Sequence, residues 1–338
     1  MTLRVGITPD VLNAVGEPIW GKGPYALLDH PGIEWEYVPK AEPAFSPDTA
    51  ARYDALCVML GRVTRDTFAR GDHRLKLVAR FGVGYDTIDV PACTANGVLL
   101  TIAPDGVRRP VALNVITFVL ALAQKLLIKD RMTREARWAD KLTEIGMGVH
   151  GRTLGLIGVG NIGGEVFRLA APFGMKHIAH DPYADPAKLR ALGVEPVDLD
   201  TLLRTADFVS VNCPLNDKTR GLIGPRELGL MKKTAYLINT ARGPIIQEKA
   251  LTEALKARRI AGAGLDVFEV EPTPKDNPIL ALDNVIVTPH GLCFTDECLD
   301  GLARSAFTSV RAFADGKAPP HIVNQDALGH ARLAALRR

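Results

Sequence analysis

Short apolar runs alternate with amphipathic stretches along most of the chain, which has 338 residues. Apolar runs bounded by turn-forming residues predict strands, and apolar residues three or four positions apart predict helices. A first set of strands is expected at Leu3–Ile7, Asp54–Leu60, Lys76–Phe81 and Val98–Ile102. A second set is expected at Thr153–Gly158, His177–Asp181, Phe208–Cys213, Ala235–Thr240, Gly262–Val267 and Asn284–Thr288. The alternation is typical of βαβ units, so we predict an α/β fold with a parallel sheet of about six strands and a smaller sheet before it.

The segment between the two sets of strands differs in character. Ala103 to Pro110 contains two prolines and a glycine, and we expect a hinge there. Val111 to Ile128 is apolar but is interrupted by three polar residues, which favours a buried helix of a soluble protein over a membrane span. The three polar residues are Asn114, Gln124 and Lys125.

The end of the chain predicts one long amphipathic helix, Thr295 to Ala314, after which we expect the chain to return to the first domain. The predicted domains are therefore 1–102 together with 291–338, and 103–290.

Charge and cysteine content exclude several classes of protein. Lys and Arg number 41 and Asp and Glu 38, so the net charge is only +3, which argues against nucleic acid as a main partner. The run Leu3–Ile7 leaves no room for a signal peptide, so we expect a cytoplasmic protein that is not bound to a membrane. The cysteines are scattered and form no C-x-x-C, so neither a disulfide framework nor a metal site is expected. They are Cys57, Cys93, Cys213, Cys293 and Cys298.

A glycine pattern follows the first strand of the second set. Gly158, Gly160 and Gly163 form G-x-G-x-x-G between that strand and an expected helix, Gly164 to Phe173. In a dinucleotide-binding fold the glycines allow a tight turn, approach of the pyrophosphate and close helix packing. Asp181 ends the next strand, where a carboxylate binds the ribose hydroxyls and repels a 2′-phosphate, so we predict NAD rather than NADP. The alternative is that the glycines form only a tight loop and that Asp181 only opens an Asp-Pro turn. The occurrence of the glycine pattern and the carboxylate together favours dinucleotide binding.

Three later strands end in residues that carry chemistry. Arg242 follows one strand, Glu269 and Glu271 follow the next, and His290 follows the last. The carboxyl ends of parallel strands meet at one edge of a sheet, where α/β proteins bind ligands. Arginine suits a carboxylate, histidine exchanges protons near neutral pH, and a glutamate beside it favours the imidazolium. Considered one at a time, such residues more often have a structural role or lie in solvent. Their occurrence together at strand ends, after the glycine pattern, predicts proton transfer coupled to hydride transfer.

A second glycine-rich turn, Phe81 to Asp86, follows a strand of the first domain. Its backbone N–H groups are suited to an anionic group, although an ordinary glycine turn fits the local sequence equally well.

Together these segments resemble the D-isomer-specific 2-hydroxyacid dehydrogenase family over nearly the whole chain, from Gly82 through His290 to Thr295. The resemblance implies two Rossmann-like doubly wound domains, with an NAD-binding domain (103–290) inserted into a smaller flavodoxin-like substrate domain (1–102 and 291–338). It also implies an active site in the cleft and a homodimer built through the nucleotide domains. On this basis Arg242 is the catalytic arginine, Glu271 orients the histidine and His290 is the acid/base.

The resemblance also implies the binding residues. The substrate carboxylate would meet backbone at Val83 and Gly84 and the side chains of Arg242 and His290, and Asp266 would contact the nicotinamide carboxamide. The cofactor-binding residues would be Gly158, Gly160, Asn161, Ile162, Gly163, Asp181, Cys213, Pro214, Thr219, Thr240, Ala241, Asp266 and His290.

The expected activity is reversible reduction of a small 2-oxo acid, such as glyoxylate or hydroxypyruvate, by NADH with His290 as proton donor. Phosphoglycerate and phosphite dehydrogenases are alternatives on the same fold, and an NAD-sensing corepressor is an alternative of another class. Formate dehydrogenases of the family usually have Gln where this chain has Glu271, which argues against that activity.

The chain departs from the family at three places. Leu113 replaces the usual hinge-helix glutamate, and Leu292-Cys293-Phe294 replaces small residues after the histidine. Near Leu60-Gly61-Arg62 the chain lacks, at the expected place, the arginine that would bind the phosphate in phosphoglycerate enzymes. Arg62, Arg108 or Arg109 would have to take that role. These departures leave the substrate side chain open.

Overall fold

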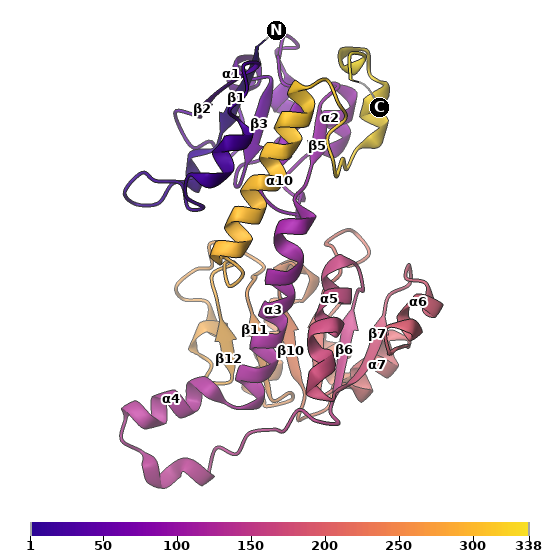
Figure 1. Cartoon of the computed structure of the whole chain (residues 1–338). Helices are drawn as coiled ribbons and strands as arrows, with labels where there is room; N and C mark the ends of the chain where they lie inside the picture. Colours follow the sequence, from indigo (N-terminus) through magenta and orange to yellow (C-terminus); the bar gives the residue numbers. More distant parts are fainter. Residues whose placement is uncertain (1, 337–338) are drawn as a thin grey trace. The chain divides into compact units, whose positions relative to one another are not determined.

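The computed structural model describes residues 2–336 and divides into two compact units, each described by itself (Figure 1). Unit 1 comprises Met1–Val107 and Phe294–Arg338, and unit 2 comprises Arg108–Cys293. The expected boundaries, after residues 102 and 290, lie within five residues of these. Both units contain parallel sheets with helices, which confirms the predicted α/β class.

Unit 1 contains a five-stranded parallel sheet of order β2-β1-β3-β4-β5. Its strands are β1 (Leu3–Ile7), β2 (Ile33–Tyr37), β3 (Ala55–Val58), β4 (Leu77–Arg80) and β5 (Leu99–Thr101). Its helices are α1 (Pro47–Arg52), α2 (Val90–Ala95) and α10 (Asp296–Ala314). The predicted helix from Thr295 to Ala314 is confirmed as α10, because the Thr295 side chain caps it by accepting from Cys298 N.

Unit 2 contains a seven-stranded parallel sheet of order β12-β11-β10-β9-β6-β7-β8. Its strands are β6 (Thr153–Ile157), β7 (Lys176–His180), β8 (Val194–Pro196), β9 (Phe208–Val211), β10 (Tyr236–Asn239), β11 (Gly262–Leu265) and β12 (Val285–Val287). Its helices are α4 (Leu126–Arg134), α5 (Asn161–Ala170), α6 (Pro186–Ala191), α7 (Leu199–Thr205), α8 (Pro225–Leu230) and α9 (Glu248–Lys256). The order reverses between β6 and β9, a switch point at which doubly wound folds bind nucleotides.

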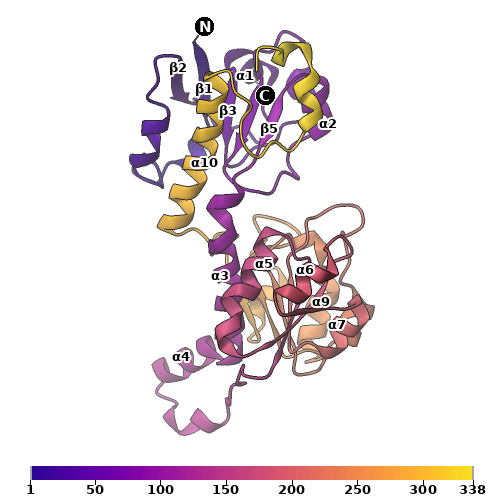
Figure 2. The same ribbon diagram turned by 45° about the vertical axis from the view of Figure 1, so that its right-hand side comes forward.

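Helices cover both faces of the sheet in unit 2 (Figure 2). On one face, buried side chains of α5 and of the long helix α3 (Pro104–Ala123) form a core with β6 and β10. On the other face, α7, α8 and α9 form a core with β9, β10 and β11. This two-layered covering explains why the strands read as continuous apolar runs.

The prediction was wrong in three respects. Strands β2 and β8 were missed, so the smaller sheet has five strands rather than four and the larger sheet has seven rather than about six. The long helix was expected to begin after Pro110, but α3 begins at Pro104 and contains Pro110. The boundary between the two units, after Val107, falls within the expected hinge segment. The expected helix to Ile128 is interrupted at Lys125, which has a φ of 52°, and continues as α4.

Among residues 2–336, α3 is the one helix long and apolar enough to cross a membrane by length and composition, with a mean hydropathy of 1.4. Of its most apolar window, 61% is buried inside the protein. Its buried residues include Val115, Phe118 and Leu122, which belong to the core of unit 2. This is how a core helix of a soluble protein packs.

Candidate active site

The glycine loop lies at the carboxyl end of β6, at the switch point of the sheet. Gly158 has a φ of +93°, and a side chain there would meet Cys213 N at 2.7 Å. A Cβ on Gly163 would meet Gly158 O at 2.6 Å, so α5 packs directly on the loop. At Gly160, by contrast, no heavy atom of residues 2–336 lies within 4 Å of the Cβ position. The main chain is therefore accessible to a ligand beside Asn161 and Ile162, which start α5 and present its N–H groups and positive dipole.

Asp181 follows β7 and is held beside this loop. Its Oδ2 accepts a hydrogen bond from Val159 N at 2.7 Å, and its Oδ1 accepts one from Tyr183 N at 2.9 Å. Each carboxylate oxygen has a further lone pair, which is what a ribose diol requires.

The segments after β9 and β10 border the same edge. Burial raises the pKa of the Cys213 thiol to about 11, so the thiol is protonated at neutral pH. The Thr219 hydroxyl donates to Pro214 O at 2.6 Å and accepts from Asn216 N at 2.8 Å, which closes the turn after Cys213. Thr240 Oγ1 is buried and has no hydrogen-bond partner among residues 2–336. A buried hydroxyl without a partner and the open main chain at Gly160 both fit a bound dinucleotide.

Arg242 is carried by a short loop after β10. Asn239, which is 1% exposed, accepts from Ala241 N and donates to Arg242 O, both at 3.0 Å. The Arg242 guanidinium donates through Nη1 to Ala241 O at 2.7 Å. A Cβ on Gly243 would lie 1.9 Å from the Phe268 carbonyl, so this loop packs against the main chain that leads to Glu271.

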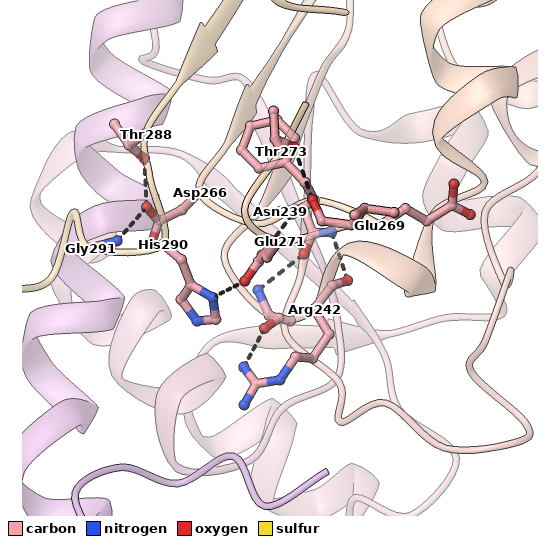
Figure 3. A network of polar contacts seen from close by, with 12 residues as sticks. Asn239, Arg242, Asp266, Glu269, Glu271, Thr273, Thr288, His290 and Gly291 are labelled. Carbon is pink, nitrogen blue, oxygen red and sulfur yellow. Dashed lines mark hydrogen bonds and ion pairs between the residues drawn. The ribbon is translucent and has the colours of Figure 1, made fainter. Parts of the chain in front are cut away.

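Glu271 and His290 form an ion pair. Nδ1 of His290 lies 2.6 Å from Oε2 of Glu271 (Figure 3). Phe268 N donates to Oε1 of Glu271 at 2.9 Å. Burial raises the pKa of Glu271, but the hydrogen bonds from His290 and Phe268 and the charges of His290 and Arg242 outweigh it. The pKa of Glu271 therefore lies below its usual value, and the carboxylate stays ionised at neutral pH.

Asp266 holds the loop that carries His290. It is 3% exposed, and its Oδ1 accepts from Thr288 Oγ1 at 2.6 Å, Gly291 N at 3.1 Å and Leu292 N at 3.2 Å. These bonds flank His290 on both sides, as Figure 3 shows for Thr288 and Gly291. The expected contact of Asp266 with the nicotinamide carboxamide stays a prediction.

The turn of Val83 and Gly84 belongs to unit 1, whereas Arg242, Glu271 and His290 belong to unit 2. Arg80 donates through Nε to Gly84 O at 2.8 Å, and its Nη1 donates to Met59 O. Ala103 N donates to Gly82 O at 2.9 Å. The turn is thus fastened to two neighbouring segments, and its role in binding substrate stays a prediction.

Several residues that build the site were missed as functional. Asn239 and Gly243 shape the loop that carries Arg242. Asn239 could have been found from the sequence, because it is a polar residue at the end of an apolar strand. Arg109 lies in the expected hinge segment and its side chain is 55% exposed, and its Nη1 lies 3.3 Å from Oε1 of the buried Glu165 of α5. Nothing in the local sequence indicated that pair, because the partners are 56 residues apart.

Comparisons with known proteins agree with this arrangement. Residues 116–291 match the family model for the D-isomer-specific 2-hydroxyacid dehydrogenase NAD-binding domain. A glyoxylate reductase of Korarchaeum cryptofilum is 40% identical over 258 residues, which are 75% of this chain and 78% of that protein. A D-3-phosphoglycerate dehydrogenase of Methanocaldococcus jannaschii is 40% identical over 286 residues, 84% of this chain but 54% of that protein.

Among solved structures, a D-lactate dehydrogenase of Aquifex aeolicus complexed with NAD and lactic acid is similar, with a TM-score of 0.79 and 27% identity. The similarity covers 92% of this chain and 96% of that one. Sequence and fold therefore agree over most of the chain, and both point to one family. The chain belongs to the D-isomer-specific 2-hydroxyacid dehydrogenases and is an NAD-dependent oxidoreductase with the two-domain Rossmann-like architecture of that family.

Proposed function

We propose that this enzyme reduces a small 2-oxo acid of glyoxylate or hydroxypyruvate size to the D-2-hydroxy acid. The observation that carries the proposal is the 2.6 Å pair of His290 and Glu271, beside which Arg242 acts electrostatically on the same carboxylate. A cation, a carboxylate and an imidazole at one sheet edge supply what carbonyl reduction requires: a charge that binds the acid and a proton for the oxygen.

Each side chain has a defined part. NADH, when bound, supplies the hydride. His290 donates a proton through Nε2 to the carbonyl oxygen, since its Nδ1 faces Glu271. Glu271 fixes the ring orientation and favours the protonated imidazole. Arg242 binds the substrate carboxylate, for which its planar guanidinium is suited.

The size of the substrate is inferred from the relatives and from the available cations. The name of the Korarchaeum cryptofilum relative, glyoxylate reductase, supports a substrate with little or no side chain. Phosphoglycerate would require a further cation for its phosphate. Arg109 is engaged by Glu165, which argues against that role for it.

The test is oxidation of NADH, followed by its absorbance, with glyoxylate, hydroxypyruvate, pyruvate and bulkier 2-oxo acids. We expect the highest kcat/KM with the smallest acids. His290→Gln should bind NADH as the wild type does and lose turnover by several orders of magnitude. Turnover retained in that variant would refute the assignment of the proton donor. Tight NADH binding without turnover of any acid by the wild type would favour the corepressor-like alternative.

A homodimer built through unit 2 is part of this proposal. Large apolar side chains are exposed on α4 and on the segment that follows it, which extends away from the sheet of unit 2 in both ribbon views (Figures 1 and 2). They are Leu126, Leu127, Trp138, Leu142 and Ile145, and Trp138 is 69% exposed. A cluster of this kind is typical of a surface that a partner covers, and a second copy of the chain brings a matching cluster.

Sedimentation equilibrium tests the dimer directly. We expect a dimer for the wild type and a monomer for the double variant Trp138→Ser, Leu142→Ser. A matched control, Tyr183→Ser, changes an aromatic residue that is 79% exposed outside this segment and should remain dimeric. A monomeric wild type, or a double variant that remains dimeric, would contradict this part of the proposal.

A further inference from the structure

One buried polar residue of the apolar helix α3 contacts the loop that carries His290. Asn114 is 4% exposed. Its amide satisfies every neighbour when the nitrogen donates to Pro110 O and Leu292 O, each at 3.2 Å, and the oxygen accepts from Cys293 N at 2.9 Å. Buried amides are almost always hydrogen-bonded, so these partners fix the orientation of the side chain. Two of the three partners are main-chain atoms just beyond His290.

The loop needs such support because His290 has a φ of +52°, in the left-handed region that residues with side chains rarely adopt. Asp266 holds the loop from the side of β11 through Thr288, Gly291 and Leu292. Asn114 holds it from the side of α3 through Leu292 and Cys293. The segment after His290 is therefore fastened between a strand end and a helix.

We infer that Asn114 is a positioning residue for the reaction. It keeps the imidazole of His290 at Glu271 and directed toward the substrate, although it contacts neither. The inference rests on the proposed role of His290 as proton donor. Because Asn114 bonds to the loop through main-chain atoms of residues 292 and 293, the side chains there can vary without loss of the anchor. This accounts for a loop in which Leu292, Cys293 and Phe294 replace the small residues usual in the family.

The first test is Asn114→Leu, which keeps the approximate volume and removes all three hydrogen bonds. We expect kcat to fall about 10- to 100-fold, because small displacements of a catalytic group are costly. The Kd for NADH, measured by fluorescence, should stay within about twofold, since none of the hydrogen bonds described for Asn114 reaches the glycine loop. The loss of kcat/KM relative to the wild type should be larger at high pH than at low pH, because a displaced imidazole no longer contacts the carboxylate of Glu271. The charged groups that this loop faces are Glu271, Asp266 and, beyond Glu271, Arg242.

The matched control is Thr117→Val, on the same helix and exposed, whose hydroxyl donates to Leu113 O rather than to the loop. It should keep kcat, Kd and the pH profile. If Asn114→Leu does not fold, Asn114→Asp is the second test. The aspartate retains an oxygen that accepts from Cys293 N, but its other oxygen faces Pro110 O and Leu292 O, where the amide nitrogen donated. Its kcat relative to the wild type should be low at neutral pH and rise as the pH falls and the carboxyl is protonated.

Two results would overturn the inference. One is a wild-type kcat and pH profile in the Asn114 variants. The other is a loss of NADH binding in proportion to kcat, which would mean that Asn114 merely supports the fold. Failure of the proposed role of His290 can be distinguished from failure of this inference. In that case His290→Gln, in the otherwise unchanged protein, would retain turnover.

Discussion

Replacing Glu271 with glutamine isolates the charge of the ion pair from its shape. Glutamine has the same size, and its oxygen can still accept from Phe268 N, as Oε1 does at 2.9 Å. Its NH₂ group then faces Nδ1 of His290, where it donates to the neutral imidazole instead of attracting a proton to it. The substitution therefore reverses the preference for the protonated ring.

The expected magnitude follows from the geometry of the pair. Unit charges about 4 Å apart attract by about 1 kcal/mol in water and about 4 kcal/mol at an effective dielectric of about 20. The side chains of His290 and Glu271 are 44% and 35% exposed, so solvent screening places the interaction toward the lower value, at about 1–2 kcal/mol. At about 1.4 kcal/mol per factor of ten in rate, Glu271→Gln should lower kcat/KM about tenfold.

The assay is the pH dependence of kcat/KM for glyoxylate reduction by NADH, from about pH 5 to pH 10. Reduction requires a protonated imidazole as proton donor, so the loss of activity in Glu271→Gln relative to the wild type should be larger at high pH than at low pH. Because the pKa of Glu271 lies below its usual value, its carboxylate stays charged throughout this range and adds no second transition.

The matched control is Glu269→Gln, which removes a charge from the same loop. No hydrogen bond joins the Glu269 side chain to His290 among the contacts that the structure describes, and its main-chain N–H donates to Glu248. Its profile should coincide with that of the wild type. An unchanged profile in Glu271→Gln, or an equal loss in Glu269→Gln, would refute the assignment of Glu271 to His290.

Two further predictions concern the cofactor. The Asp181 carboxylate should repel the nearly doubly charged 2′-phosphate, so kcat/KM with NADH should exceed that with NADPH at least about 100-fold, and Asp181→Ser should reduce this ratio at least about tenfold. Equal rates of the wild type with both cofactors would contradict this. Gly160→Ala should keep the thermal unfolding midpoint within a few degrees and raise the Kd for NADH, because the added methyl points into open space. Gly163→Ala should lower the midpoint as well, because its methyl would meet Gly158 O; equal midpoints for the two variants would be inconsistent with these contacts.

The predicted strands were those with continuous apolar runs, and the two missed strands lack this signal. Burial of β2 is confined to Ile33, because Glu34, Trp35 and Glu36 are exposed at the edge of the sheet. β8 is three residues long, also forms an edge, and ends in Pro196. Edge strands are half-solvated, so their sequences resemble those of loops.

The start of α3 was predicted too late in the chain because prolines and glycine were counted as helix breakers. Pro104 occupies the first position of the helix, where a missing N–H has no cost. Pro110 lies inside the helix and is accommodated there. Packing of the apolar residues that follow outweighed the local preference of this segment.

The location of the candidate site at one edge of the sheet could be predicted from the sequence, because parallel strands place their carboxyl ends together. Arg242, Glu271 and His290 each follow such an end, and Glu271 and His290 are within hydrogen-bonding distance. The groups that hold them could not be predicted. Asn114 and Leu292 are far apart in sequence, and their contact depends on how α3 packs on the sheet rather than on any local pattern.

The absence of a side chain at residue 243 limits how this enzyme can be redesigned. The Arg242 loop and the chain leading to Glu271 meet there backbone to backbone, so any substituent would separate a substrate-binding group from the partner of the proton donor. A library intended to broaden the range of accepted acids should keep this glycine fixed. Diversity is better introduced at Leu292, Cys293 and Phe294, where the loop is secured through its main chain.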